Sequence, residues 1–474
     1  MEEIVLYFVS NSESKFKELK QMAKNTKYDI QWYKYSIKEL QTDNVEQLLR
    51  HKVLDAFRKL KRPVMVDHTI LEVEAFNSLP GLQTNYFFRK MGNEEIVKFC
   101  NYKKEWKAKV VTKLCCCTGK KIIISDGFEE GRIVDNPNIS NKGYDWDDIF
   151  KPAVDNDRDD VYSKLDKNSR SMRKKAWEDL IVKLSSEEIF FTHAEKYKEN
   201  IEDLAELICK KKVMLFIGAG ISASIGLPSW NKLIGELGEA DDFDAEIFSE
   251  YGDNMLLAEY SETLNNNENR LQDMFTDKWD IKSNDILRSE LEKSLIYKYI
   301  MELDCPVIYT TNFDHMIEDY YEMKKKEIHR VAVMDDFDNS EQKHPRLMKF
   351  HGDMKYKDSI VFTESQYFKR MDYQSFMDIK LQADLLKYNV LFLGYSLSDI
   401  NIKQLLYISR KRWADNGNKK ISYIYTATPN YVQEKVFEKN GIISISGGVA
   451  DKKIATELFL KDLCEQIKIL KKRS

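Results

Sequence analysis

The most constraining part of this sequence is residues 213–230, where a short apolar run leads directly into a glycine-rich turn. The run VMLFI has the length and composition of a buried strand. Gly218, Ala219 and Gly220 follow it. Glycines at the carboxyl end of a strand let the backbone approach a ligand, and a helix that starts there offers N–H groups to phosphate. A tight strand–helix corner without a ligand has the same pattern, so the turn alone leaves both interpretations open.

A chain of 474 residues is too long for one ordinary domain, and two or three are expected. Hydrophobic residues make up 43% and charged residues 32%, so each domain can bury a core. The net charge of −4 does not suggest direct nucleic-acid binding. The seven cysteines form no disulfide framework, which predicts a cytoplasmic protein. No apolar run approaches the roughly 20 residues of a membrane span, so no membrane association is expected.

The first half of the chain alternates strand-like and helix-like segments. Short apolar runs predict strands at residues 4–10, 63–66, 106–117 and 121–125. Amphipathic spacing predicts helices at residues 45–60 and 169–184. The strand at residues 63–66 is expected to end at Asp67. A polar, charged linker at residues 185–198 then separates the two halves.

Five short strings in the first half, in order, are similar to those of the inosine triphosphate pyrophosphatase family. That family uses magnesium to hydrolyse inosine-type purine triphosphates to monophosphate and pyrophosphate. The strings are SNSESK at 10–15, KELQ at 38–41, DHTIL with LPG at 67–71 and 79–81, GYDWD at 143–147, and KNSRSMR at 167–173. The resemblance implies a nucleotide site formed by Asn11, Lys15, Asp67, His68, Trp146, Asp147, Lys167, Ser171 and Arg173. It also implies Glu39 and Asp67 as magnesium ligands.

Departures from the family pattern bear on turnover. His68 stands where the family has the aspartate credited with activating water, and Met172 stands where it has a histidine. A histidine is neutral or cationic at neutral pH, so it cannot replace an anion that holds magnesium and draws a proton from water. We therefore expect a nucleotide pocket that keeps binding and has lost most hydrolysis. The alternative is a working hydrolase in which these changes are tolerated.

The second half places polar residues directly after several strand-like runs. Buried strands are predicted at residues 306–309, 346–350, 390–393 and, as the last one, 421–426. Asn312 follows the first of these runs and His351 follows the second. Alone, such an asparagine is most often a helix N-cap, and a lone histidine is usually structural. Strands alternating with helices, with candidate ligand residues at successive strand ends, predict a doubly wound parallel sheet.

Four motifs in this half, in order, resemble those of the sirtuin-like family. They are Gly-Ala-Gly-x-Ser-x-x-x-Gly-x-Pro-x-Trp from residue 218, Thr-x-Asn-x-Asp from residue 310, His-Gly at 351, and Gly-x-Ser from 394. The resemblance implies that Asn312 positions ribose or water and that His351 accepts a proton. It further implies an NAD site formed by Gly218, Ala219, Gly220, Ser222, Pro228, Trp230, Thr311, Asp314, Gly394, Ser396 and Asp399. The chain lacks the two Cys-x-x-Cys pairs of protein-deacetylating sirtuins, so no zinc is expected. It is more similar to the sirtuin-like NAD hydrolases of bacterial antiphage defence.

The sequence therefore predicts an α/β chain with two domains. Residues 1–187 are expected to form a mixed α/β pyrophosphatase-like domain that senses a purine triphosphate of the deoxyinosine or inosine type. Residues 188–474 are expected to form a Rossmann-like, sirtuin-like domain with a helical insertion that hydrolyses NAD. One alternative is an active pyrophosphatase fused to an NAD-dependent deacylase, and another is a passive NAD- or ADP-ribose-binding module. A homo-oligomer is expected by analogy with both families.

Overall fold

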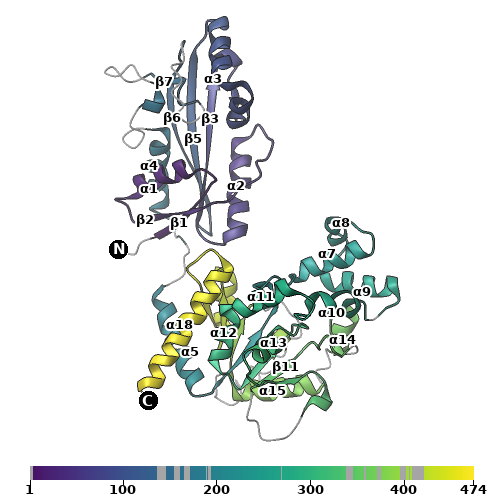
Figure 1. Cartoon of the computed structure of the whole chain (residues 1–474). Helices are drawn as coiled ribbons and strands as arrows, with labels where there is room; N and C mark the ends of the chain where they lie inside the picture. The colour runs from purple at the N-terminus through teal and green to yellow at the C-terminus, as the bar shows by residue number, and fades with distance from the viewer. Residues whose placement is uncertain are drawn as a thin grey trace. The chain divides into compact units, whose positions relative to one another are not determined.

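The computed structural model divides into two compact units, Met1–Phe191 and Thr192–Ser474, and each is considered by itself (Figure 1). Some residues in each unit fall outside the part of the chain that the structure describes. The described residues are 4–135, 146–153, 161–164, 171–187, 189, 194–267, 269–337, 345–356, 359–370, 375–395, 402–404, 406–407 and 421–473.

The first unit is built on a mixed seven-stranded sheet with strand order β2-β1-β3-β5-β6-β7, in which β4 pairs with β3. β1 is parallel to β2 and β3, whereas β3, β5, β6 and β7 are antiparallel in succession. The strands are β1 (Ile4–Val9), β2 (Tyr28–Tyr33), β3 (Val64–Val73), β4 (Leu79–Gly81), β5 (Lys107–Cys117), β6 (Ile122–Ile133) and β7 (Phe150–Pro152).

Helices cover this sheet because each presents an apolar stripe to it. Helix α4 packs on β5 and β6, and its Trp177 joins Cys116 in one core cluster. Helix α2 contacts β3 and β5. The three consecutive cysteines at 115–117 are buried in the core, and this burial raises the pKa of their thiols. The helices are α1 (Glu13–Ala23), α2 (Val45–Leu60), α3 (Thr84–Lys103) and α4 (Met172–Leu184), with short 3-10 turns at Glu74–Phe76 and Tyr162–Lys164.

The structure corrects the predicted extent of two strands. β3 continues to Val73, so Asp67 lies inside the strand and not at its end. β6 likewise continues to Ile133. The apolar run stops at Asp67, but β3 pairs with β5 along its whole length, from Val64 to Val73. The polar residues after Asp67 are therefore part of the strand because they pair with β5. The apolar content of the segment alone does not predict this pairing.

The second unit is a doubly wound, fully parallel sheet with strand order β10-β11-β9-β8-β12-β13-β14, which confirms the predicted fold class. Alternate residues of the central strand β8 enter two different cores: Leu215 joins one cluster and Phe216 the other. The strands are β8 (Val213–Ile217), β9 (Val307–Thr310), β10 (His329–Val331), β11 (Arg346–Lys349), β12 (Asn389–Leu393), β13 (Ser422–Thr426) and β14 (Ile442–Ser446).

A helical insertion lies between β8 and β9, as predicted (Figure 1). Part of it forms a small core of its own, in which Leu233, Leu257 and Phe275 meet Phe313 from the loop after β9. The helices are α5 (Ala194–Cys209), α6 (Ala219–Ala223), α7 (Trp230–Ala240), α8 (Ala245–Ser249), α9 (Asn254–Asn265), α10 (Arg270–Trp279), α11 (Asp285–Lys293), α12 (Leu295–Leu303), α13 (Met316–Met323), α14 (Glu364–Lys369), α15 (Phe376–Lys387), α17 (Tyr431–Lys439) and α18 (Lys452–Arg473), with a 3-10 turn at Met334–Asp336.

Two strands of this sheet, β10 and β14, were not predicted from the sequence. The segment at 421–426 is not the last strand, because β14 pairs with β13 beyond it. β10 forms the opposite edge beside β11. β14 alternates isoleucine with serine, and β10 consists of His329, Arg330 and Val331, so neither contains the apolar run that marks the central strands.

Among the helices that the structure describes, none combines the length and the apolar composition needed to cross a bilayer.

The turns that follow β8 and β12 pack closely against each other. A Cβ atom on Gly218 would lie 2.5 Å from Cδ2 of Tyr395 and 2.6 Å from the carbonyl oxygen of Gly394. Gly394 has φ +60°, and a Cβ atom on it would lie 2.6 Å from the amide nitrogen of Ile221. These glycines therefore allow two strand ends to meet, and backbone atoms supply most of the close contacts.

We expect Gly394→Ala to destabilise the second unit by about 1–3 kcal/mol, because the added methyl group overpacks backbone atoms that have no free space. Gly448→Ala is the matched control, since a Cβ atom there meets nothing within 4 Å. Thermal unfolding of the two variants and the unaltered chain checks this expectation. Equal unfolding curves for all three proteins would contradict the packing role of Gly394.

Candidate active site and candidate nucleotide site

A cavity of about 770 Å³ opens at the carboxyl ends of the parallel strands in the second unit. It lies where the chain passes from β8 to β9 on one side of the sheet and later to β12 on the other, the point at which open α/β sheets bind ligands. Its lining comes from the segments after β8, β9, β11 and β12 and from the insertion. The lining residues are Ala219, Gly220, Ser222, Leu227, Pro228, Trp230, Asn231, Leu233, Asp253, Asn254, Met255, Trp279, Thr311, Asn312, Phe313, Asp314, His351, Tyr367, Gly394 and Tyr395.

A buried hydrogen-bond chain fixes the polar side of this cavity. Ser222 Oγ donates to Asp314 Oδ2 at 2.8 Å and accepts from Asn312 Nδ2 at 2.9 Å. Asn312 and Asp314 are each 8% exposed. Because its nitrogen is bound to Ser222, the carboxamide of Asn312 has a fixed orientation. Its oxygen, on the other side of the group, is an acceptor suited to a hydroxyl or a water.

His351 follows β11 and is buried against Tyr367. The Tyr367 hydroxyl lies 3.3 Å from Nδ1 of His351, and the two rings meet edge to face at 5.1 Å between centroids. The next residue, Gly352, has φ +89°, and a Cβ atom there would lie 2.1 Å from the carbonyl oxygen of Ser359. A glycine is therefore required after His351, because only glycine fits the backbone conformation that places the imidazole at the cavity.

The structure brings most of the sequence-predicted NAD residues to one cavity. Gly218 lies directly before the lining residue Ala219, whereas Ser396 and Asp399 fall outside the described residues. One expected feature differs: the amides of Gly218 and Gly220 donate to the carbonyls of Leu393 and Gly394, at 2.9 and 3.0 Å. Those two amides hold the turns together, so they are not directed to a phosphate. The predicted residues that line the cavity are Ala219, Gly220, Ser222, Pro228, Trp230, Thr311, Asn312, Asp314, His351 and Gly394.

Several lining residues were not predicted from the sequence. Tyr395 is the middle residue of the Gly-x-Ser string, so the motif indicated that this position lies near the cavity. Tyr367, on α14, and Trp279, at the end of α10, belong to no motif. Only the packing of the insertion and of α14 around the strand ends brings them to the cavity.

The first unit contains a second cavity, of about 690 Å³, at the turn after β1 and beside the middle of β3. It gathers the predicted residues Asn11, Lys15, Glu39, Asp67 and His68. The remaining lining residues are Val9, Ser10, Ser12, Tyr35, Ser36, Ile37, Lys52, Thr69, Asn85 and Arg89.

Of the other predicted nucleotide residues, Arg173 contacts Asp67, whereas Trp146, Asp147 and Ser171 do not line this cavity. Trp146 is buried and stacks on Tyr162 at 5.5 Å between ring centroids, so in this structure it belongs to the hydrophobic core. Ser171 is the N-cap of α4 and accepts from the amide of Lys174. Asp147 is buried, and Lys167 falls outside the described residues. Their contacts to a nucleotide stay predictions.

Buried charges hold the centre of this second cavity. Lys15 Nζ lies 3.0 Å and Arg173 Nη2 3.2 Å from Oδ2 of Asp67. Lys52 Nζ lies 3.0 Å from Oε1 of Glu39 and donates to the carbonyl oxygen of Asp67. Burial alone would raise the pKa of Asp67, but Lys15, Arg173 and Lys52 outweigh it and hold that pKa well below its usual range. Asp67 is therefore ionised at neutral pH.

Lys52 was not predicted from the sequence, although the sequence contains a signal for it. It lies on the buried face of α2 between Leu48 and Ala56, where a lysine is out of place unless it meets a partner. That partner is the carboxylate of Glu39. A charged residue on the apolar stripe of an amphipathic helix is thus a usable indicator of a site.

His68 is a neutral residue at neutral pH. Burial, followed by the nearby Lys52 ammonium, lowers its pKa to about 4. Its Nε2 lies 3.1 Å from the carbonyl oxygen of Leu82, so in the neutral ring Nε2 carries the proton. Nδ1 is then an acceptor, 3.7 Å from Oε1 of Glu39. The residue adds no negative charge to the cavity.

The donor chemistry of this cavity fits a magnesium ion that arrives with phosphates. Mg²⁺ is commonly held by one or two protein carboxylates together with substrate phosphates. Glu39 is 46% exposed, whereas Asp67 is 4% exposed and held by Lys15 and Arg173. Glu39 is therefore the better placed of the two predicted ligands.

Comparison with known proteins assigns both units. Residues 6–183 match the Ham1 family and residues 306–445 match the SIR2-like domain. Over 169 residues the chain is 31% identical to the dITP/XTP pyrophosphatase of Saccharolobus solfataricus, covering 36% of this chain and 88% of that protein. The chain belongs to the Ham1 family through its first unit, and it carries a SIR2-like domain in its second.

Two further relatives match in part. The inosine triphosphate pyrophosphatase of Candida albicans is 36% identical over 137 residues, which cover 28% of this chain and 65% of that protein. The NAD(+) hydrolase ThsA of Enterococcus faecium is 27% identical over 250 residues, covering 52% of this chain and 48% of that protein. The matches thus span just under two thirds of the first relative and about half of the second.

The lowered pKa of His68 predicts a pH-dependent stability of the first unit. The unfolded histidine binds a proton as the pH falls through 6.5, but the folded one does so only near 4. The free energy of unfolding should therefore fall by up to about 3 kcal/mol as the pH drops through this window.

Hydrogen exchange of the β3 amides, compared at each pH with His68→Asn, measures this loss of stability. The variant should show a flatter dependence between pH 6.5 and 4. An NMR signal of His68 that titrates near 6.5 in the folded chain would contradict the burial argument.

Proposed function

We propose that the second unit hydrolyses NAD⁺ to nicotinamide and ADP-ribose. The observation that carries this proposal is the convergence of Asn312 and His351 with the glycine-rich turn after β8 in one cavity at the switch point of the sheet. The cavity volume of about 770 Å³ lies in the range of small-molecule and cofactor sites. The similarity to the ThsA hydrolase supports the same reaction.

The proposed chemistry breaks the bond between the nicotinamide nitrogen and the ribose. Nicotinamide leaves as a neutral molecule with the bonding electron pair, and an oxocarbenium-like ribose develops. A water attacks that carbon and loses a proton, which His351 accepts. Asn312 orients the water or a ribose hydroxyl through its carboxamide oxygen. In sum, NAD⁺ and water yield nicotinamide, ADP-ribose and a proton.

We expect His351→Ala and Asn312→Ala each to lower NAD hydrolysis by about 100-fold or more, as removal of a proton acceptor or of a positioning group does. His329→Ala is a matched control, because His329 lies on β10 and does not line the cavity. Released nicotinamide is the measurement, with circular dichroism to verify folding. Near-normal release from the two cavity variants would overturn the assignment, and turnover of acyl-lysine peptides would favour a deacylase.

We further propose that the first unit binds a purine nucleoside triphosphate and thereby stimulates the second unit. Lys15, Lys52 and Arg89 line the cavity, and their positive charge suits phosphates. Glu39 would hold a magnesium ion, which supplies charge neutralisation to the phosphates. His68 is neutral and stands where the family has an anion that activates water. We therefore expect the unit to bind a deoxyinosine- or inosine-type triphosphate and to hydrolyse little of it. Such an enzyme would deplete NAD in a phage-infected cell.

Stimulation requires that the nucleotide bind one state of the protein better than another. A resting equilibrium of 99 to 1 would need about 5.5 kcal/mol of differential binding for complete reversal. Charged contacts to three phosphates and a metal are of a kind that can supply this difference. By the same linkage, an NAD analogue that resists cleavage should tighten nucleotide binding by an equal factor.

We expect deoxyinosine triphosphate to raise NAD hydrolysis by the full chain and Lys15→Ala to blunt that increase without changing the basal rate. Lys17→Ala is the control on the same helix, since Lys17 is exposed and pairs only with Glu13 among the ion pairs of the described residues. Nicotinamide and pyrophosphate release are measured together. Rapid magnesium-dependent pyrophosphate release would show a working pyrophosphatase, and an unchanged NAD rate with every nucleotide would overturn the coupling.

A further inference from the structure

A fully buried lysine lies behind the proposed NAD site. Lys349, the last residue of β11, has a side chain that is 1% exposed. Its ammonium group donates to the backbone carbonyl of Asp314 and lies 3.4 Å from Oε1 of Glu318 and 3.7 Å from Oδ2 of Asp353. A buried ammonium is costly to desolvate, so it persists only where fixed acceptors surround it.

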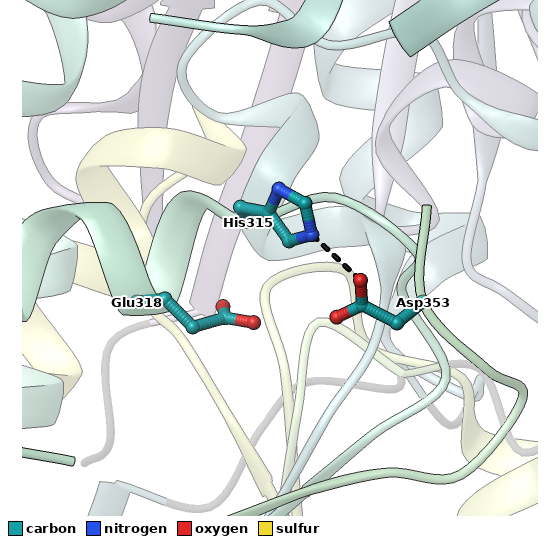
Figure 2. Close-up of side chains that lie close together, drawn as sticks. All are labelled: His315, Glu318 and Asp353. Carbon is teal, nitrogen blue, oxygen red and sulfur yellow. Dashed lines mark hydrogen bonds and ion pairs between the residues drawn. The ribbon is translucent and has the colours of Figure 1, made fainter. Parts of the chain in front are cut away.

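The acceptors of Lys349 belong to a cluster with the donor set of a metal site. His315, Glu318 and Asp353 place ligand atoms within 4.8 Å of one another, and Nε2 of His315 lies 2.7 Å from Oδ1 of Asp353 (Figure 2). However, the ammonium of Lys349 is within 4 Å of both carboxylates. Lys349 and Asp353 are 1% and 0% exposed, so water cannot screen the repulsion between a metal ion and this ammonium, unlike at Glu39, which is 46% exposed. The cluster therefore already contains cations, which are Lys349 and also Arg330, whose Nη1 lies 3.3 Å from Oδ1 of Asp353.

The Lys349 cation is connected to the proposed catalytic groups through Asp314. Lys349 holds the backbone carbonyl of Asp314, while the side chain of Asp314 accepts from Ser222, which in turn holds Asn312. Asp353 follows His351 by two residues and is completely buried. The segments that carry Asn312 and His351 are thus tied to one internal charge.

We propose that Lys349 is a positioning residue for NAD cleavage, acting through Asp314 and Ser222 on the carboxamide of Asn312. This inference rests on the proposed hydrolase activity. Neutral residues of the same size would fill the space but would not hold the Asp314 carbonyl. Small displacements of a positioning group cost a large part of the rate.

We expect Lys349→Met to lower kcat for NAD by about 10- to 100-fold with a smaller change in KM, because a misaligned carboxamide impairs the reaction more than binding. The substitution removes a cation from Glu318 and from the completely buried Asp353, which keeps His315 and Arg330 as partners, and it can impair folding. The double variant Lys349→Met with Glu318→Gln removes one negative charge as well and keeps the net charge. Its kcat should stay low although it folds, since the Asp314 carbonyl is still not held.

A double-mutant cycle with Ser222→Ala separates positioning from general damage. If Lys349 acts through Ser222, Lys349→Met should lower kcat less than about twofold in the Ser222→Ala background. A full additional loss in that background, or a normal kcat in the charge-balanced double variant, would overturn the inference. Lys468→Met, which removes an exposed ion pair with Glu302, is the control. Absence of NAD cleavage by the unaltered chain would instead overturn the proposed function.

Discussion

The parallel pairing of β8 with β9 and β12 is the constraint on which the second unit depends. In this register Ile217 lies opposite Thr310 on one side and Leu393 on the other. Three chain segments that are far apart in sequence therefore leave the sheet at one edge. The glycine turn, the segment of Asn312 and the Gly394 turn meet there because parallel strands end together. The neighbouring β11 adds His351 to the same edge.

The two cavities differ in the way they hold polar groups, and this difference matches the two ligands proposed for them. The cavity of the second unit presents a hydroxyl and a carboxamide, which Ser222 and Asn312 hold in a neutral hydrogen-bond chain to one carboxylate. Such groups suit a ribose and a water. The cavity of the first unit is built from ion pairs, with Lys15 on Asp67 and Lys52 on Glu39. Such groups suit phosphates and a metal ion.

Buried charges occur at both sites, and they are better explained by positioning than by stability. Asp67 in the first unit and Lys349 in the second are almost completely inaccessible. Apolar residues of similar size would stabilise a fold at least as well, since desolvation of a charge offsets most of its attraction. A buried charge with several fixed partners nevertheless allows few alternative arrangements. At both sites this restricts where neighbouring groups can lie.

The sequence by itself determined the local elements and the motif residues of the second site. The strand Val213–Ile217 and the helix Val45–Leu60 have the predicted bounds, because apolar spacing and flanking polar residues act over a few positions. The tertiary structure alone decided the length of β3, the edge strands β10 and β14, and the core position of Trp146. It also brought Tyr367 to the cavity of the second unit and Lys349 to the backbone carbonyl of Asp314. Each of these depends on contacts between residues far apart in the chain, and local periodicity contains no information about such contacts.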